Sequence, residues 1–298
     1  MLLNSTNLTT VDTAIRTAFN ERLTGVETTF GKIAMTVPST TKTQEYPSLS
    51  MMSGMREWIG DRVINRLGIE TFSITNRKFE KTIAISRDEI EDDQYGVYTP
   101  IASDLGQTAA ELPDELVWEM LEKGFDTTHY DGQNFFDTDH PVRDADDVEQ
   151  SVSNFTAGAG AAWYLVDTTR MIKPLIFQNR RAATITAKTR LTDDNVFDSD
   201  EFVWGADRRC AAGFGAWELI HASKQPLTAA NYAAVRKAML EMRGDGGRKL
   251  NLRPNLLVVS AENEGAAREI LMAERNAAGA TNVWRNTAEL HVETRLSA

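Results

Sequence analysis

The spacing of apolar residues near the start of the chain predicts a helix. Apolar side chains recur at every fourth position, at Val11, Ile15, Phe19 and Leu23. This spacing places them on one face of a helix that Thr9 or Thr10 could cap and Gly25 could end. The apolar stripe is narrow, so the helix needs a partner surface. We expect that surface to belong to a neighbouring copy of the chain.

Two later stretches alternate apolar and polar residues, as strands do. The first runs from Ile33 through a threonine-rich region, and the second covers residues 70–90. In the second, the apolar positions change from even to odd between Thr75 and Phe79, which predicts a bend or bulge near Asn76. We interpret the two stretches as one long two-stranded arm, with a short amphipathic helix between them around "MREWIGDRVINRL". An isolated ribbon is marginally stable in water, so the arm should lie on another surface.

A long helix is predicted to follow, over residues 98–125. Apolar residues keep helical spacing at Ile101, Leu105, Ala109, Leu112, Leu116, Met120 and Phe125. Such a helix would be on the order of 40 Å long. Pro113 either kinks it or starts a second helix after Leu112. A long helix beside a long ribbon makes an elongated molecule, which is not typical of a compact enzyme.

The rest of the chain predicts β structure up to about residue 224 and α/β structure after it, which gives an α+β fold class. Strands are expected at 161–178 and 182–191, and the glycines of 200–223 mark bends or close backbone approach. After these come a helix at 227–243 capped by Thr228, a buried strand "NLLVVS", a helix at 261–276 and an alternating strand at 288–296. The first of these helices is expected to bury Tyr232, Val235, Met239 and Met242.

Composition limits the possible functions. A chain of 298 residues can form one large domain or two ordinary ones. The net charge of −11 disfavours electrostatic capture of nucleic acid. The single cysteine, Cys210, cannot form an intrachain disulfide and is expected to be a small buried residue made in a reducing compartment. The sequence has no signal-peptide pattern and no apolar run long enough to span a membrane, so we expect a protein that is cytoplasmic when made.

The strongest chemical candidate is "NFFDTDHP", which brings together Asp137, Asp139 and His140, with His129 and Asp131 nearby. These are ligand types that zinc or manganese accepts, so a metal-dependent hydrolase is one interpretation. Their spacing matches neither a helical zinc pair nor an EF-hand loop. Asp, Asn, Gly and Pro also form turns through bonds to their own backbone, so a tight structural loop is the other interpretation.

The remaining candidates are weaker. His221 and His291 lie in strand-like segments, and no nucleophile elbow is present. The segment "RGDGGRKL" follows a helix and lacks the phosphate-loop pattern, so it predicts a turn. The acidic run "RDEIEDDQ" is typical of a solvated face or a helix start. Weak chemical signals throughout the chain favour a structural or interaction role.

Several stretches, in order over nearly the whole chain, carry a family resemblance. They include "REWIGDRVI", "FEKTIAISRDEIEDDQYGVYTPI", "YDGQNFFDTDHPV", "DNVFDSDEFVWGADRRCAAGFGAWELIHA" and "GDGGRKLNLRPNLLVV". Together they resemble the Mu-like phage major head subunit family, gpT, whose members are major capsid proteins with the Hong Kong 97 fold. The resemblance implies that the Asp/His stretch is a family hallmark without an assigned catalytic role.

The resemblance also implies a division of the chain. It implies an N-terminal arm at 1–30, an extended E-loop at 31–92, a peripheral domain at 93–224 whose spine helix is 98–125, and an axial domain at 225–298. In the fold's founding member, a lysine and an asparagine crosslink neighbouring subunits. Lys78 and Lys81 lie in the E-loop so defined. The sequence identifies no matching asparagine and acid, so no crosslinking residue is assigned.

The implied function is that of a major capsid protein without catalytic, metal-binding or cofactor-binding residues. It would assemble with itself, as hexamers and pentamers, into an icosahedral shell around the double-stranded DNA of a tailed phage or Mu-like prophage. Scaffold, protease and portal proteins would be further partners, DNA would not be bound sequence-specifically, and no membrane would be involved. The location would be the virion, and the host cytoplasm during assembly. Two alternatives stay open: the hydrolase using Asp137, Asp139 and His140, and an encapsulin-like shell protein.

Overall fold

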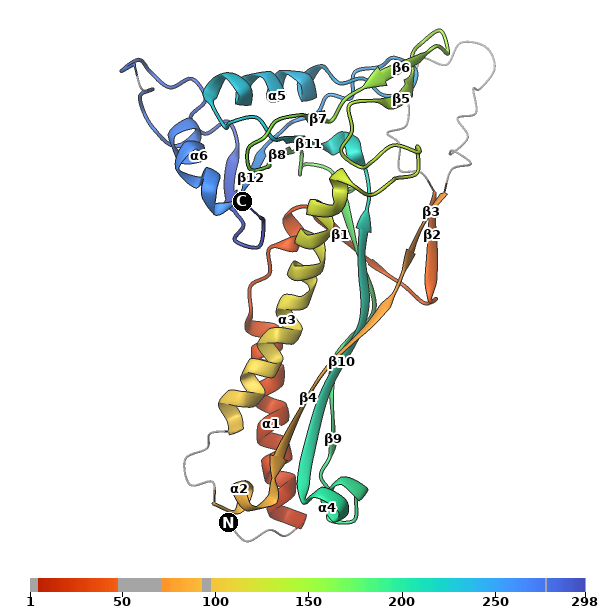
Figure 1. Cartoon of the computed structure of the whole chain (residues 1–298), viewed down its shortest axis with the longest axis vertical. Helices are drawn as coiled ribbons and strands as arrows, with labels where there is room; N and C mark the ends of the chain where they lie inside the picture. The colour runs from red at the N-terminus through yellow and green to blue at the C-terminus, as the bar shows by residue number, and fades with distance from the viewer. Residues whose placement is uncertain (1–4, 48–70, 93–97, 277, 298) are drawn as a thin grey trace.

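The molecule is elongated, with long helices and strands along its length and a wider α/β part at one end (Figure 1). The computed structural model describes residues 5–47, 71–92, 98–276 and 278–297. The predicted short helix around "MREWIGDRVINRL" lies outside these residues. The mixture of helices and sheets matches the predicted α+β class.

Helix α3 (Tyr98–Glu122) confirms the predicted long helix, and a 3₁₀ turn continues it over Lys123–Phe125. The helix runs through Pro113, so a second helix starting there is wrong. Because proline has no N–H, the carbonyl of Ala109 lacks its usual helical donor. Arg208 of strand β10 (Glu201–Phe214) donates from Nη1 to that oxygen at 3.2 Å. This bond replaces the missing one and ties the helix to the sheet.

Helix α1 (Ser5–Gly25) packs along α3 of its own chain. Its apolar stripe is as predicted, with Ile15 and Phe19 fully buried. The expectation that this stripe lies on a neighbouring copy is wrong, because α3 covers it. The two helices approach closely at Gly106, where an added Cβ would lie 2.4 Å from the carbonyl oxygen of Phe19. A residue without a side chain is therefore needed at this crossing.

The ends of α1 differ in part from the prediction. Gly25 ends the helix as expected, but the helix already includes Ser5, so neither Thr9 nor Thr10 caps it. The hydroxyl of Thr10 instead donates to the carbonyl of Thr6 at 3.1 Å, one turn back. Threonine in a helix interior commonly satisfies its hydroxyl in this way.

Among the described residues, a four-stranded sheet in the order β1-β9-β10-β4 lies beside α1 and α3. Strand β1 (Ala34–Pro38) pairs parallel with β9 (Leu175–Lys188), and β4 (Arg77–Ser86) pairs antiparallel with β10. The prediction of one long two-stranded arm is therefore wrong: β1 and β4 pair with strands from the middle of the chain. Strand β9 also runs unbroken where two separate strands were expected.

A short hairpin of β2 (Thr43–Pro47) and β3 (Thr71–Thr75) projects from this body. The predicted bend is confirmed at Asn76, which separates β3 from β4. Its side-chain amide donates to the Ser39 hydroxyl at 3.0 Å and to the carbonyl of Thr41 at 2.9 Å. The bend therefore has polar partners that hold it in place.

The wider part of the molecule contains a five-stranded sheet in the order β13-β12-β8-β11-β7. Its strands are β7 (Phe155–Thr156), β8 (Trp163–Val166), β11 (Ile220–Ser223), β12 (Leu256–Val259) and β13 (Glu289–Val292). β8 pairs antiparallel with both β11 and β12, so one sheet joins strands from both sides of the change expected near residue 224. Local periodicity cannot show such a pairing between distant segments.

Two helices cover this sheet. In α5 (Ala229–Glu241) the Thr228 side chain caps the first turn by accepting from the N–H of Asn231, and the predicted apolar face is buried. Helix α6 (Glu264–Leu271) confirms the second prediction in shorter form. The remaining elements are α2 (Arg87–Asp92), α4 (Asp194–Ser199), β5 (His140–Arg143), β6 (Glu149–Val152) and 3₁₀ turns at Phe30–Lys32, Trp217–Leu219 and Ala261–Asn263. Cys210 is buried, as expected.

Gly106→Ala should destabilise the isolated subunit by roughly 1–3 kcal/mol, because the new methyl group must push α1 away from α3. The measurement is urea or thermal unfolding followed by circular dichroism. Gly265→Ala in α6 is the matched control, since an added Cβ there meets nothing within 4 Å. Alanine favours helix, so the control should keep or raise stability. Equal effects of the two substitutions would contradict the close helix contact.

Candidate functional site

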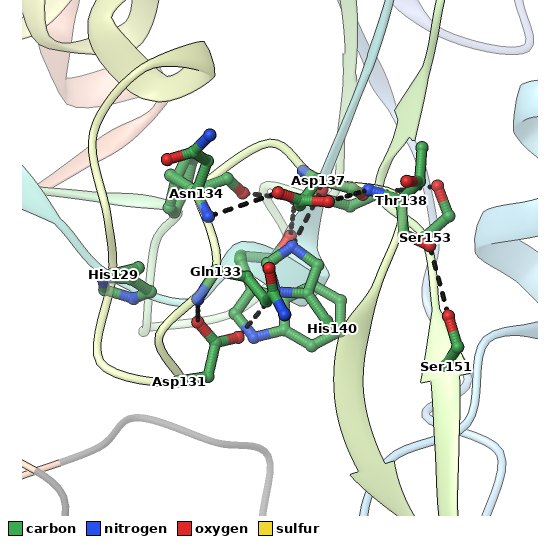
Figure 2. A network of polar contacts seen from close by, with 12 residues as sticks. His129, Asp131, Gln133, Asn134, Asp137, Thr138, His140, Ser151 and Ser153 are labelled. Carbon is green, nitrogen blue, oxygen red and sulfur yellow. Dashed lines mark hydrogen bonds and ion pairs between the residues drawn. The ribbon is translucent and has the colours of Figure 1, made fainter.

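The Asp/His loop follows helix α3 and holds a polar cluster around buried His140 (Figure 2). His140 is fully buried, and its ring stacks on Trp217 with a centroid distance of 3.9 Å and an interplanar angle of 7°. Its Nδ1 lies 2.6 Å from Oδ2 of Asp131, and its Nε2 lies 3.1 Å from Oδ1 of Asn154. Both ring nitrogens are therefore occupied by protein groups.

Asn154 is the centre of this cluster. Its Nδ2 donates to the carbonyls of Phe135 at 2.8 Å and Trp217 at 3.3 Å. Its Oδ1 also accepts from the backbone N–H of Asp137 at 2.9 Å. One fully buried amide thus joins three loops that lie far apart in the sequence. Because Asn154 Oδ1 can only accept, Nε2 of His140 donates to it.

Asp137 and Asp139 do not converge with His140 on a common point. The Asp137 carboxylate accepts from the backbone N–H of Thr138 at 2.6 Å and of Asn134 at 3.4 Å, which is the turn pattern expected of aspartate. Asp139 is exposed. In the described part of the chain, no group of three or more His, Cys, Asp or Glu residues is arranged to hold a metal ion. The geometry is that of a structural loop, and it offers no support to the hydrolase alternative.

The other two buried histidines are also structural. His129 Nε2 lies 2.9 Å from the carbonyl of Gly215, and burial lowers the pKa of His129 to about 4. His221 Nε2 lies 2.9 Å from the hydroxyl of Thr156, and burial lowers the pKa of His221 to about 4 as well. Both rings are therefore neutral near pH 7, and each fastens one segment to another.

A second polar cluster joins the end of the α1 segment to helix α3. The buried carboxylate of Asp114 accepts, through Oδ1, from the backbone N–H of Thr29 at 2.9 Å and of Phe30 at 2.7 Å. Burial raises the pKa of Asp114, whereas these two N–H groups act in the opposite direction. Trp118 Nε1 donates to the Thr29 hydroxyl at 3.0 Å. The chain that leaves α1 is thereby held against helix α3.

Glu293 extends this cluster to the C-terminal strand. Its Oε2 accepts from the Thr29 hydroxyl at 3.2 Å, and its Oε1 accepts from both the backbone N–H and Nη1 of Arg295 at 3.1 Å. Burial alone would raise the pKa of Glu293, but hydrogen bonds from His291 and Arg295, with the charge of Arg295, lower it to about 2. We name Thr29, Asp114, Trp118 and Glu293 the arm clasp.

The hairpin has its own fastening. Tyr46 donates from its hydroxyl to Oε1 of buried Gln178 on β9 at 2.7 Å. Phe72 stacks on Tyr46 with a centroid distance of 5.4 Å and lies 5.3 Å from the ring of His129. The Tyr46–Phe72 pair therefore holds the hairpin against the body in one orientation. An open groove of about 620 Å³ lies beside it, lined by Phe72, Arg77, Met120 and Tyr130 among others.

The remaining sequence candidates have structural explanations. "RGDGGRKL" is a turn in which Gly246 and Gly247 have positive φ, and the N–H of Gly246 donates to the carbonyl of Arg143 at 2.8 Å. The acidic run includes helix α2, where Arg87 pairs with Glu91. None of the helices that the structure describes is both long and apolar enough to cross a membrane.

Sequence reasoning missed Asn154, Asp114 and Glu293. Asn154 and Glu293 lie in short polar stretches that look like surface, and Asp114 follows a helix proline. A polar residue beside a strand signal gives no indication that it is buried, because its partners lie elsewhere in the chain. The oxygens of Glu293 and Thr29 meet across 264 residues of sequence.

Asn154→Ala should lower the free energy of unfolding by about 3 kcal/mol, because it leaves several buried polar groups without partners. Asp139→Ala, in the same loop but exposed, is the matched control and should leave stability unchanged. Urea unfolding of the two variants measures the difference. A metal site would give a different result: Asp139→Ala would then reduce bound metal measured by elemental analysis, and with it stability.

Glu293→Gln should destabilise the subunit by about 2 kcal/mol at pH 7, because an ionised acceptor is replaced by a neutral one. The pKa of Glu293 is about 2 in the folded protein, below its ordinary value of 4.5. The stability that its charge contributes is therefore complete above about pH 4.5 and is lost as the pH falls towards 2. The free energies of unfolding of the unmodified protein and of Glu293→Gln should approach each other as the pH falls from 7 to 3. A difference between the two proteins that stays constant with pH would contradict this explanation.

Curated relatives share this sequence over most of its length. The chain is 40% identical over 289 residues to the "Major capsid protein" of Escherichia phage Mu, a match that covers 95% of each chain. It is 42% identical over 266 residues to the "Mu-like prophage FluMu major head subunit" of Haemophilus influenzae, covering 87% of this chain and 86% of that protein.

The fold is also shared with a solved structure. A subunit in the procapsid of bacteriophage JBD30 matches with a TM-score of 0.89 and 39% identity, covering 99% of this chain and 100% of that one. This match confirms the predicted α+β fold of the Hong Kong 97-like capsid proteins.

A family model agrees with these matches over almost the whole sequence. The model described as "Mu-like prophage major head subunit gpT" matches residues 8–296. The matched region includes the Asp/His loop, the arm clasp, the hairpin and both sheets. This chain therefore belongs to the Mu-like prophage major head subunit gpT family, which confirms the resemblance seen in the sequence.

Proposed function

We propose that this chain is the major capsid protein of a Mu-like phage or prophage, and that copies of it build the icosahedral head around double-stranded DNA. The observation that carries the proposal is the match of the whole chain to a procapsid subunit. The shape agrees with this proposal. The elongated body, the projecting hairpin and the part of the four-stranded sheet that α1 and α3 do not cover leave large surfaces for neighbouring copies.

The proposed E-loop is smaller than the sequence alone implied. It comprises the hairpin strands β2 and β3 with residues 48–70 between them. Strand β4 is excluded, because it pairs with β10 over ten residue pairs and so belongs to the body. The hydrogen bond from Tyr46 to Gln178 holds the hairpin in a defined direction. This direction is suited to reaching over a neighbouring subunit in the shell.

The proposed domains follow the two sheets. The peripheral domain consists of α1, α3 and the four-stranded sheet, with α3 as its spine helix. The axial domain consists of the five-stranded sheet with α5 and α6. Residues 155–166 and 220–223 are placed in the axial domain, because their strands pair within that sheet. The described part of the proposed N-terminal arm, residues 5–30, would then lie on helix α3 of its own subunit.

The proposed partners are other copies of the chain, as hexamers and pentamers, with scaffold, protease and portal proteins during assembly. The net charge of −11 suits a wall that encloses packed DNA without binding it tightly, since a strongly basic surface would bind phosphates at many points. We propose no catalytic step, because Asp137 and His140 are bonded into the fold and exposed Asp139 does not converge with them on a common point. The proposed locations are the virion and, during assembly, the host cytoplasm.

Expression of the chain, alone and beside its scaffold protein, tests this function. The expected result is a fast-sedimenting fraction that electron microscopy shows as closed shells of uniform size or as sheets of sixfold rings. The purified small species should bind DNA weakly at moderate salt. A chain that remains a small soluble species under both conditions would count against the proposal.

A further inference from the structure

Three cations face one another across the four-stranded sheet. Arg209 on β10 lies directly opposite Lys78 on β4 and opposite Arg181 on β9. Residues directly opposite in a sheet point to the same face, and like charges in such positions destabilise it. Asp207 pairs with Arg181. Within the described residues, the side chains of Lys78 and Arg209 make no hydrogen bond and no ion pair. We name Lys78, Arg181 and Arg209 the cation row.

The cation row lies on the open face of the sheet. The neighbouring residues Phe79 and Arg208 point the other way, towards α3: both line the small cavity between this helix and the sheet, and Arg208 bonds to Ala109. Neighbours along a strand point to opposite faces. The cation row therefore faces away from α3, on the side that α1 and α3 leave uncovered.

An exposed aromatic residue stands at the far end of the same sheet. Phe197 lies on α4, between the ends of β9 and β10, and 87% of it is exposed. The fold holds it there: Val196 beside it is buried, and Nδ2 of Asn195 donates to the carbonyls of Lys188 at 3.2 Å and Glu201 at 2.6 Å. A large apolar side chain is thus presented to solvent by a fixed support.

Acidic residues surround Phe197. Asp194 and Asp198 flank it on α4 and are exposed. Their carboxylates make no hydrogen bond and no ion pair in the described part of the chain. The arrangement is an apolar anchor with an uncompensated acidic rim, and we name Asp194, Phe197 and Asp198 the acidic tip. Hot spots of interfaces commonly have this form, an aromatic centre within a polar rim.

We propose that the acidic tip of one subunit docks on the cation row of a second copy of this chain, as one of the contacts that close the shell. Lys78 and Arg209 in the row, and Asp194 and Asp198 at the tip, have no charged partner among the described residues, and the two sets are opposite in sign. The inference rests on the proposed function. It concerns a heterologous contact, in which two different surfaces meet and which forms closed rings in symmetric assemblies.

The charges also decide between this contact and a simpler one. If acidic tips met one another around a symmetry axis, the aspartates of every copy would lie close together and repel. The cation row offers such a tip two like-charged side chains, Lys78 and Arg209, directly opposite each other on adjacent strands. Docking on the cation row neutralises both surfaces and buries Phe197.

A charge exchange tests the proposal in the full-length chain. Lys78→Glu with Arg209→Glu reverses the row, and Asp194→Lys with Asp198→Lys reverses the tip. Each double variant alone should lower the yield of shells at least tenfold, measured by sedimentation and electron microscopy. Combining all four substitutions should restore shells, because the pair is again complementary. Lys237→Glu, an exposed cation on α5 away from both surfaces, is the matched control and should assemble normally.

Two further measurements separate docking from folding. The melting temperatures of the row and tip variants as isolated subunits should not fall, and Arg209→Glu should not lower the melting temperature, because it removes a like-charge contact. Phe197→Ser should lose shells while the subunit keeps its melting temperature. Normal assembly of either charge-reversed variant, or failure of the combined variant to recover when all subunits are folded, would overturn the contact. Absence of shells from the unmodified chain would instead overturn the proposed function, and the contact with it.

Discussion

A hydrogen bond from strand β10 attaches α3, the longest helix in the described part of the chain, to the sheet beneath it. Pro113 deprives the carbonyl of Ala109 of its helical donor, and Arg208 supplies another from strand β10. Burial lowers the pKa of Arg208. Its guanidinium is stabilised by the face of the Phe177 ring, whose centre lies 5.2 Å away. Helix α3 is thus attached to the sheet at the position where its own backbone is weakest. Together with the apolar contacts of α3 on β9 and β10, this attachment aligns the helix with the sheet.

That alignment determines which surfaces remain open. Helix α1 packs beside α3, so the helices cover one face of the four-stranded sheet, while the β2–β3 hairpin covers part of the other face around Ile176 and Ala211. The arm clasp then fixes the chain between α1 and β1, and the bond from Tyr46 to Gln178 fixes the hairpin. These attachments are made by polar groups within the subunit, so a subunit can present its open face and its hairpin in a defined geometry before it meets a neighbour. Such preorganisation lowers the entropy cost of association.

The sequence was a good guide to elements and a poor guide to their partners. Periodicity located α3, the buried face of α5 with its Thr228 cap, and the bend at Asn76, because these depend on residues within a few positions. It failed for β4, whose partner strand lies more than a hundred residues later. Alternation shows that one face of a strand is buried, but not what covers it. The clusters around Asn154 and Glu293 were invisible for the same reason, since their bonds join distant segments.

The placement of charge also follows from this architecture. The buried acids Asp114, Asp167 and Glu293 accept bonds from backbone N–H groups or basic side chains inside the fold, so their charge is compensated within the subunit. Several exposed acids also pair with basic side chains, such as Glu119 with Lys123, but the 43 acids outnumber the 32 lysines and arginines and give the molecule its excess of negative charge. Copies of such a chain repel one another in solution, and a shell can close only where apolar burial or opposite charges overcome that repulsion. Lys78 and Arg209 are informative about contacts for this reason, because they lie opposite each other as like charges in the isolated subunit and gain opposite charges only when a neighbour arrives.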